Sequence, residues 1–310
     1  MSSVPKFFLT LGGLAATIYL GICLYLYFWQ QRLIFLPSNR WEVTPTILGV
    51  AYEEVWLPVP GQTRATIHGW CLPKGPESDV ILYLHGNGSN VGGNLNQAQQ
   101  FRSLGFSVLL IDYRGYGHSK GNFPTEKQVY EDARLAWNYL LRERQIGPDH
   151  ILSTAIPWGG AIAIELALRY PEVAGLILEG TFTSIQDLGQ IRPAYRLFPI
   201  SWLLTQRFDS LGKIRAVRSP LLFIHGTADD VVPAQMSEIL YEAARSPKRL
   251  LLIPQAGHNN VSALGAERYS QAILEFQRWV KAEQLAYQSL QRTENKAIAI
   301  KVSTEAKIRA

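Results

Sequence analysis

Apolar runs of strand length alternate with helix-patterned segments through most of this chain. The runs have no polar face, which is typical of strands that are covered on both sides in a parallel sheet. Because helical periodicity returns between them, the pattern predicts an α/β fold with a mostly parallel sheet and helices on both faces. The predicted strands are 80–84, 107–111, 151–156, 173–178, 221–224 and 250–253, and the predicted helices are 95–104, 126–144, 158–170, 233–244 and 262–281.

The chain ahead of the first of these strands carries a different signal. Two β-type segments, 52–59 and 66–72, are separated by a turn rich in proline and glycine at 58–61. Two short β segments joined by such a turn are typical of a hairpin. We therefore expect an N-terminal hairpin before the parallel sheet.

The alternation is interrupted between Gly180 and Ser219 by a longer stretch with several aromatic residues. We expect a short helical cap at about 181–218, over the carboxyl edge of the sheet where open α/β folds bind ligands. After residue 281 the sequence becomes polar and aperiodic, which predicts a C-terminal tail at 282–310. The α/β domain itself is predicted to span 32–281.

Residues 7–29 contain no charged side chain, and aromatic residues crowd the C-terminal end of this run. The run exceeds the roughly 20 apolar residues that cross a bilayer as a helix, so residues 1–31 are predicted to be a single-pass membrane anchor with the lipid bilayer as partner. A cleaved signal peptide is the alternative, but no small-residue cleavage site follows. Lys6 lies on one side and Arg32 and Arg40 on the other, so the charges do not predict which side of the membrane the domain occupies.

Composition excludes several other classes of function. The formal net charge is +5, and the basic residues are scattered, so nucleic-acid binding is not expected. The two cysteines, Cys23 and Cys71, lie in apolar segments and are expected to be buried thiols rather than a disulfide. There is no Cys/His cluster with metal spacing and no glycine-rich phosphate loop, so we expect neither a metal nor a cofactor.

Four motifs follow the predicted strands. Since the carboxyl ends of parallel strands meet at one edge of a sheet, the motifs are expected to lie close together. They are His-Gly-Asn-Gly at 85–88, Asp-Tyr-Arg-Gly-Tyr-Gly at 112–117, Ala-Ile-Pro-Trp-Gly-Gly at 155–160, and His-Gly-Thr-Ala-Asp at 225–229 followed by Gly-His-Asn at 257–259.

In this order and spacing the motifs resemble the α/β-hydrolase superfamily, and more narrowly its single-pass, membrane-anchored branch related to serine aminopeptidases and acyl-thioester hydrolases. The resemblance covers about 32–281. It implies a catalytic triad in the chain order nucleophile, acid, histidine, with Asp229 as the acid and His258 as the base. It also implies an oxyanion hole at Asn87 and Trp158. For Asp229 alone, the alternative is a carboxylate that caps the following helix.

The same resemblance places Pro157 where the family has the serine of Gly-x-Ser-x-Gly. Proline has no hydroxyl, and its ring fixes φ at about −65°, whereas the strained turn that presents the serine needs a positive φ. Proline suits the first position of a helix and biases Ile156 towards an extended conformation. We therefore expect a relaxed junction between strand and helix, with the Trp158 N–H turned away from an oxyanion hole.

These observations favour an inactive or strongly impaired descendant of a serine ester or thioester hydrolase that keeps a pocket for an acyl or lipid-like ligand. The alternative is an active serine hydrolase of the carboxylesterase, acyl-thioesterase or peptidase type, which has serine at 157 or uses another hydroxyl. Ser153 and Thr154 lie inside a predicted strand, and Ser89 and Ser119 lie in turns. A third hypothesis is a structural membrane protein whose pocket is filled.

Overall fold

The computed structural model of the chain describes residues 3–40 and 43–309. Its centre is an eight-stranded sheet with the order β1-β2-β4-β3-β5-β6-β7-β8. The hairpin of β1 and β2 joins this sheet antiparallel to β4, and β3 to β8 are all parallel. The strands are β1 (Glu53–Pro58), β2 (Thr66–Leu72), β3 (Val80–Leu84), β4 (Ser107–Ile111), β5 (Ile151–Ala155), β6 (Gly175–Glu179), β7 (Leu221–Gly226) and β8 (Lys248–Ile253).

Each predicted strand is present, and no strand end differs from the prediction by more than two residues. Every residue of β3, β4, β5, β6 and β7 is buried, which is why these segments show no polar face in the sequence. The predicted fold class, a mostly parallel sheet preceded by a hairpin, is confirmed.

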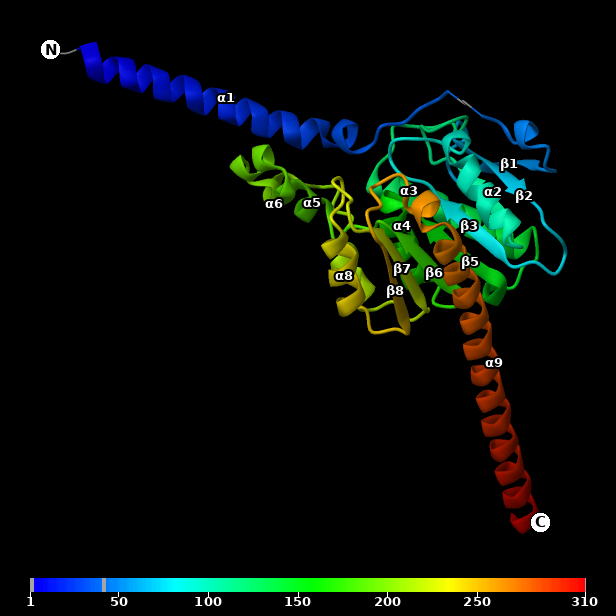
Figure 1. The fold of residues 1–310 in the computed structure, drawn as a ribbon. Coiled ribbons are helices and arrows are strands. Elements are labelled where there is room, and N and C mark those ends of the chain that lie inside the picture. The colour runs from blue at the N-terminus through cyan, green and yellow to red at the C-terminus, as the bar shows by residue number, and fades with distance from the viewer. Residues whose placement is uncertain (1–2, 41–42, 310) are drawn as a thin grey trace.

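Helices cover both faces of the sheet (Figure 1). Trp137 of α3, Ile162 of α4 and Leu240 of α8 belong to the hydrophobic cluster on one face, and Phe101 of α2 and Phe276 of α9 belong to the cluster on the other. The two clusters form the core of the domain and fix the carboxyl edge of the sheet. These helices are α2 (Leu95–Ser103), α3 (Glu126–Arg142), α4 (Pro157–Arg169), α8 (Ala234–Ala243) and α9 (Val261–Arg309).

The stretch between β6 and β7 forms short helices, as expected for a cap. Figure 1 shows α5 and α6 standing clear of the sheet, near the N-terminal helix α1. The cap consists of α5 (Ile185–Ile191), the 3-10 helix η4 (Pro193–Leu197), α6 (Ile200–Leu203) and α7 (Ser210–Ile214). Three further 3-10 helices are short: η1 (Pro45–Leu48) precedes β1, η2 (Gly92–Asn94) precedes α2, and η3 (Pro148–His150) precedes β5.

Helix α1 (Ser3–Ile34) projects away from the domain (Figure 1). Its segment Phe7–Ile34 is long and apolar enough to cross a membrane, and 6% of its most apolar window is buried. Most of the helix therefore lies outside the hydrophobic core, with its apolar side chains facing outward, and of its described side chains only that of the C-terminal residue Ile34 packs into that core.

The last helix is longer than the sequence pattern predicts. We expected it to end at residue 281, but α9 continues through the polar tail to Arg309 and stands clear of the sheet at its far end (Figure 1). The tail lacks an apolar stripe, yet it is rich in Ala, Glu, Lys and Gln, which have high helix propensity. Absence of periodicity here indicates a helix without a packing face rather than an irregular chain.

Candidate functional site

Asp229 and His258 lie on the loops after β7 and β8, and the structure brings their side chains together. His258 Nδ1 lies 2.8 Å from Asp229 Oδ2. Because a carboxylate can only accept, Nδ1 carries the proton and Nε2 is left as a proton acceptor. The His258 side chain is 19% exposed and the Asp229 side chain is 1% exposed. This arrangement orients an imidazole whose free nitrogen could take a proton from a hydroxyl.

The Asp229 carboxylate is held by groups from its own loop as well. Its Oδ1 accepts hydrogen bonds from the backbone N–H groups of Val231 (2.9 Å) and Val232 (2.8 Å). Burial alone would raise the pKa of the Asp229 carboxyl, but hydrogen bonds from His225, His258 and the Val232 N–H outweigh it and hold that pKa below its usual range. Asp229 does not cap the following helix α8, whose N-cap is Pro233 and has no side-chain hydrogen bond; its Oδ1 holds its own loop, and its Oδ2 contacts His258.

His225 is a third member of this site that the sequence did not single out. Its Nε2 lies 2.8 Å from the Val232 carbonyl oxygen and 3.3 Å from Asp229 Oδ2, and its Nδ1 lies 2.7 Å from Ser237 Oγ. The carbonyl requires a proton on Nε2, so Nδ1 accepts from the Ser237 hydroxyl. Both His225 and Ser237 are fully buried. They fix the Asp229 loop, and the position of His225 at the end of a buried strand, four residues before Asp229, was the available signal.

Pro157 is the first residue of α4, and the junction before it is relaxed. Ile156 is extended, with φ −91° and ψ 166°, and Pro157 is not among the residues with positive φ. The backbone is thus the one expected from the proline ring. Pro157 is buried, and Gly180 lies between it and the acid: a Cβ at Gly180 would lie 3.2 Å from Pro157 Cγ and 3.9 Å from Asp229 Oδ2.

The glycine pair after Trp158 brings α4 close to the sheet. A Cβ at Gly159 would lie 2.0 Å from the Leu84 carbonyl oxygen, so only glycine permits this distance between helix and strand. The Trp158 ring packs against Phe182 and Phe208, with centroid distances of 5.0 and 5.8 Å. The start of α4 is therefore tightly fixed even though it lacks a serine.

Asn87 lies in the loop that follows β3 and connects the site to α1. The side-chain amide nitrogen of Asn87 donates to the Ile34 carbonyl oxygen (2.8 Å). The backbone carbonyl oxygen of Asn87 accepts from the Leu36 N–H (3.1 Å) and the Tyr116 hydroxyl (2.8 Å). Asn87, Trp158 and His258 all line one cavity. The structure thus gathers these three predicted residues at one place, while an oxyanion-hole role for Asn87 and Trp158 stays a prediction.

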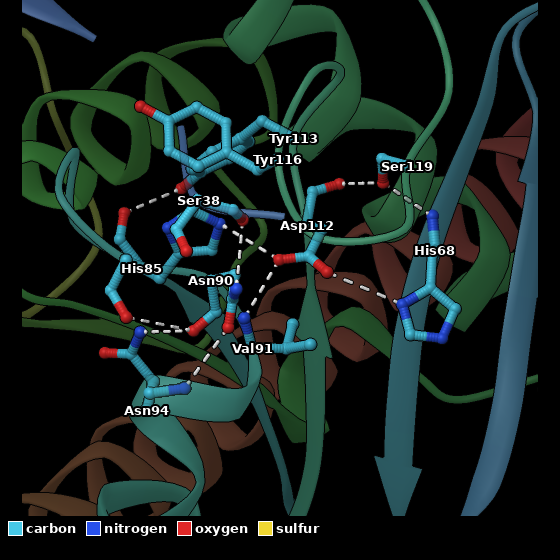
Figure 2. Close-up of polar contacts among 12 residues, drawn as sticks. Ser38, His68, His85, Asn90, Val91, Asn94, Asp112, Tyr113, Tyr116 and Ser119 are labelled. Atoms are coloured by element: carbon cyan, nitrogen blue, oxygen red, sulfur yellow. Dashed lines mark hydrogen bonds and ion pairs between the residues drawn. The ribbon is translucent and has the colours of Figure 1, made fainter. Parts of the chain in front are cut away.

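A buried polar cluster around Asp112 holds the loop that carries Asn87. Figure 2 shows His85 and His68 on opposite sides of the Asp112 carboxylate, at 3.7 Å from Oδ1 and 3.5 Å from Oδ2. The Val91 N–H donates to Asp112 Oδ1 (2.9 Å), and the Asn90 amide donates to the Ser38 carbonyl oxygen (3.0 Å). These contacts fix the shape of the loop after β3 that carries Asn87.

Three hydroxyls that could replace a serine at position 157, those of Ser119, Ser153 and Thr154, are held in a turn or inside a strand. Ser119 Oγ donates to the Asp112 carbonyl oxygen (2.6 Å) and accepts from the His68 N–H (2.8 Å), as Figure 2 shows. Ser153 and Thr154 are buried within β5. None of these hydroxyls belongs to the cavity that His258 lines.

The cavity itself has a volume of about 400 Å³ and a mostly apolar lining. Its walls come from three parts of the chain: the C-terminal end of α1, the cap, and the loops of the candidate site. The lining residues include Leu26, Gln30 and Leu33 of α1, Leu188, Arg192 and Leu203 of the cap, and Asn87, Trp158 and His258. Sequence reasoning had not predicted that α1 forms a wall of this cavity.

Gln30 attaches α1 to the cap. Its amide nitrogen donates to the Leu203 carbonyl oxygen (3.0 Å), and its amide oxygen accepts from the N–H groups of Thr205 (2.8 Å) and Gln206 (3.1 Å). Gln30 is 6% exposed. A polar amide at the end of a long apolar run was the signal for this contact.

Among the residues that the structure describes, no group of three or more His, Cys, Asp or Glu side chains could hold a metal ion.

Comparisons with known proteins agree with this architecture. Residues 75–213 match the family model described as serine aminopeptidase, S33. The uncharacterised protein Rv2307c of Mycobacterium tuberculosis is 33% identical over 266 residues, which cover 85% of this chain and 92% of that protein. The α/β hydrolase domain-containing protein WAV2 of Arabidopsis thaliana is 28% identical, with coverage of 85% and 92%. The Pyrococcus furiosus esterase Pf2001 superposes with a TM-score of 0.66 at 18% identity, covering 79% of this chain and 99% of that one.

Proposed function

This chain belongs to the α/β-hydrolase superfamily, and from that premise we propose that it is an inactive or strongly impaired descendant of a serine ester or thioester hydrolase, held at a membrane by α1 and binding an acyl or lipid-like ligand. One observation carries the proposal. Pro157 begins α4 in an ordinary helical conformation at the turn where the superfamily presents its serine, next to an assembled Asp229–His258 pair.

Ester hydrolysis by this superfamily needs a hydroxyl that attacks the carbonyl carbon while the histidine takes its proton. His258 Nε2 is free to accept that proton, but position 157 has no hydroxyl to give it. Loss of a triad nucleophile costs about 10⁶-fold in turnover, and the remaining donors and binding contacts give about 10³–10⁴-fold over water. The chemistry is therefore missing while the proton acceptor is retained.

The cavity supports retained ligand binding. Its volume lies within the range of about 300–1,000 Å³ that is common for small-molecule sites. Leucine and isoleucine side chains from α1 and the cap dominate its walls. Burial of each methylene group of an acyl chain in such a site contributes about 0.8 kcal/mol. This lining favours an acyl chain over a sugar or a nucleotide.

Turnover of a nitrophenyl ester by the purified full-length protein tests the missing nucleophile. The wild-type protein is expected to show no turnover above background, and Pro157→Ser is expected to gain turnover that disappears in the Pro157→Ser/His258→Ala double variant. Wild-type turnover that His258→Ala abolishes would overturn the proposal.

The assembled Asp229–His258 pair also supports a second candidate function, an active serine hydrolase that uses a different hydroxyl. Asp229 is fully hydrogen-bonded and buried, as a working orienting carboxylate would be. This candidate predicts wild-type turnover that survives Pro157→Ala and is lost in His258→Ala. The nitrophenyl ester assay therefore separates the two candidates.

A further inference from the structure

The cap contacts α1 over a long part of that helix, well beyond Gln30. The Tyr19 hydroxyl donates to the Leu197 carbonyl oxygen (3.1 Å), and the Tyr19 ring stacks on Phe198 with a centroid distance of 5.3 Å. Gln30 holds the other end of the cap through Leu203. The tip of the cap, residues 191–204, therefore reaches the middle of α1.

The position of Tyr19 along α1 sets the depth of this contact. The uncharged run ends at Trp29, and a helix rises about 1.5 Å per residue, so Tyr19 lies about 15 Å further along the axis. That distance is about half of a hydrocarbon core of about 30 Å. If α1 crosses the bilayer, a cap tip that touches Tyr19 cannot stay in water.

The outer surface of the cap tip has the composition that such a location requires. Leu197 is 72% exposed and Trp202 is 87% exposed. The segment 188–204 contains no carboxylate, and its two charged residues are Arg192 and Arg196. Arginine has a long apolar stem and can reach lipid phosphates from below the interface.

The backbone of the cap tip is also suited to a place without water. The N–H groups of Tyr195, Phe198, Trp202 and Leu204 donate to carbonyl oxygens within the cap. Two other positions, 193 and 199, are prolines, which have no N–H to satisfy. Backbone donors left open in a hydrocarbon environment would cost several kcal/mol each, so this pattern removes most of that cost.

From the exposed apolar tip, its depth along α1 and its closed backbone, we propose that the cap segment 191–204 is inserted into the leaflet beside α1. The cavity above His258, whose walls are α1 and this cap, then takes up its ligand from the leaflet. The partner of this surface is a phospholipid bilayer. The inference rests on the proposed role of α1 as a membrane anchor.

Depth measurement by spin labelling tests the insertion directly. Full-length protein lacking its two native cysteines would be reconstituted into phosphatidylcholine nanodiscs and labelled in turn at Leu197→Cys and Trp202→Cys. Leu14→Cys on α1 is the control for lipid, and Ile239→Cys on α8 is the control for water, because both side chains are exposed in the structure. Relaxation by oxygen, which concentrates in lipid, would be compared with relaxation by a water-soluble nickel chelate.

The label at 197 is expected to favour oxygen as strongly as the label at 14, and the label at 202 to favour oxygen less strongly because the neighbouring Leu203 contacts Gln30 at the end of the uncharged run, while the label at 239 favours nickel. If 197 and 202 behave like 239 while 14 remains in lipid, the cap is not inserted and the inference fails, although the anchor stands. If 14 also favours nickel, the anchor fails, and this part of the proposed function fails with it. Neither readout depends on catalysis, so the nitrophenyl ester result is independent.

Discussion

At position 157, the proposed function rests on a single side chain. Proline has no hydroxyl, and as the first residue of α4 it follows an extended Ile156 in an ordinary strand-to-helix junction rather than a strained elbow. Restoring the hydroxyl alone therefore asks the backbone to regain a strained conformation. We expect Pro157→Ser to recover only part of the activity of a working relative, because that strain costs of order 1–3 kcal/mol.

Asp229 should make the free energy of unfolding depend on pH in the acid range. Because its hydrogen bonds lower its folded-state pKa, its contribution is present above the ordinary carboxyl pKa of about 3.9 and is lost as pH falls below it. Asp229→Asn is expected to cost about 1.5–3 kcal/mol at neutral pH, the range for hydrogen bonds to a charged group, and less near pH 3. Thermal unfolding in detergent at both pH values checks this. An equal cost at both would contradict it.

Glu179, at the end of β6, should act in the opposite direction. Burial raises the pKa of the Glu179 carboxyl. The hydrogen bond from Tyr269 (2.7 Å) and the smaller effects of His225, His258 and Gln97 lower that pKa, but burial outweighs them. Its contribution is therefore fullest at acid pH and is lost as pH rises. Glu179→Gln is expected to raise the melting temperature relative to wild type more at pH 8 than at pH 4, which lies below the ordinary glutamate pKa of about 4.3. Melting curves of both proteins at the two pH values measure this, and a constant difference would contradict it.

At the scale of elements, the buried ion pair between Arg114 and Asp132 joins the β4 loop to α3. Arg114 Nε lies 2.7 Å from Asp132 Oδ1, and both side chains are fully buried. Arg114 also contacts Glu131, which is 30% exposed. Asp132→Ala should cost about 3–5 kcal/mol because the buried Arg114 loses the acceptor of its Nε and of its backbone N–H and keeps only the partly exposed Glu131 as a charged partner. Glu131→Ala is the matched control and should cost about 1 kcal/mol or less. Equal costs in chemical denaturation would contradict this assignment.

The contact of α1 with the cap gives a second prediction for these elements. Gln30→Leu keeps a side chain of similar size but removes the hydrogen bonds to Leu203, Thr205 and Gln206. The cap should therefore detach from α1 more often. Faster trypsin cleavage after the exposed Arg207 is the expected result. Gln31→Leu is the control, since Gln31 makes none of these side-chain bonds. Unchanged cleavage in Gln30→Leu would show that this amide does not hold the cap.

At the scale of the whole molecule, the sequence predicted the sheet because each buried strand is a local signal. The motifs likewise predicted that Asp229 and His258 lie close together, since their place after β7 and β8 is set by chain order, while their catalytic roles stay a prediction. The cavity was out of reach, because Gln30 and Leu203 are far apart in sequence and meet only through tertiary docking. His225 was missed because the sequence shows its place at the end of a buried strand but not the partners, such as Ser237, that define its role. The extent of α9 was missed because propensity, rather than periodicity, carries it past residue 281.

Under the proposed function, the molecule is an α/β-hydrolase-fold domain with an assembled Asp229–His258 pair, an apolar cavity built partly from its own N-terminal helix, and no hydroxyl at position 157 to serve as nucleophile. Treatment of the full-length protein with a fluorophosphonate, followed by intact-mass and peptide mass spectrometry, tests this most directly. The wild-type protein is expected to gain no adduct, whereas Pro157→Ser gains one at position 157 that depends on His258. A wild-type adduct on any serine or threonine, lost in His258→Ala, would contradict the account.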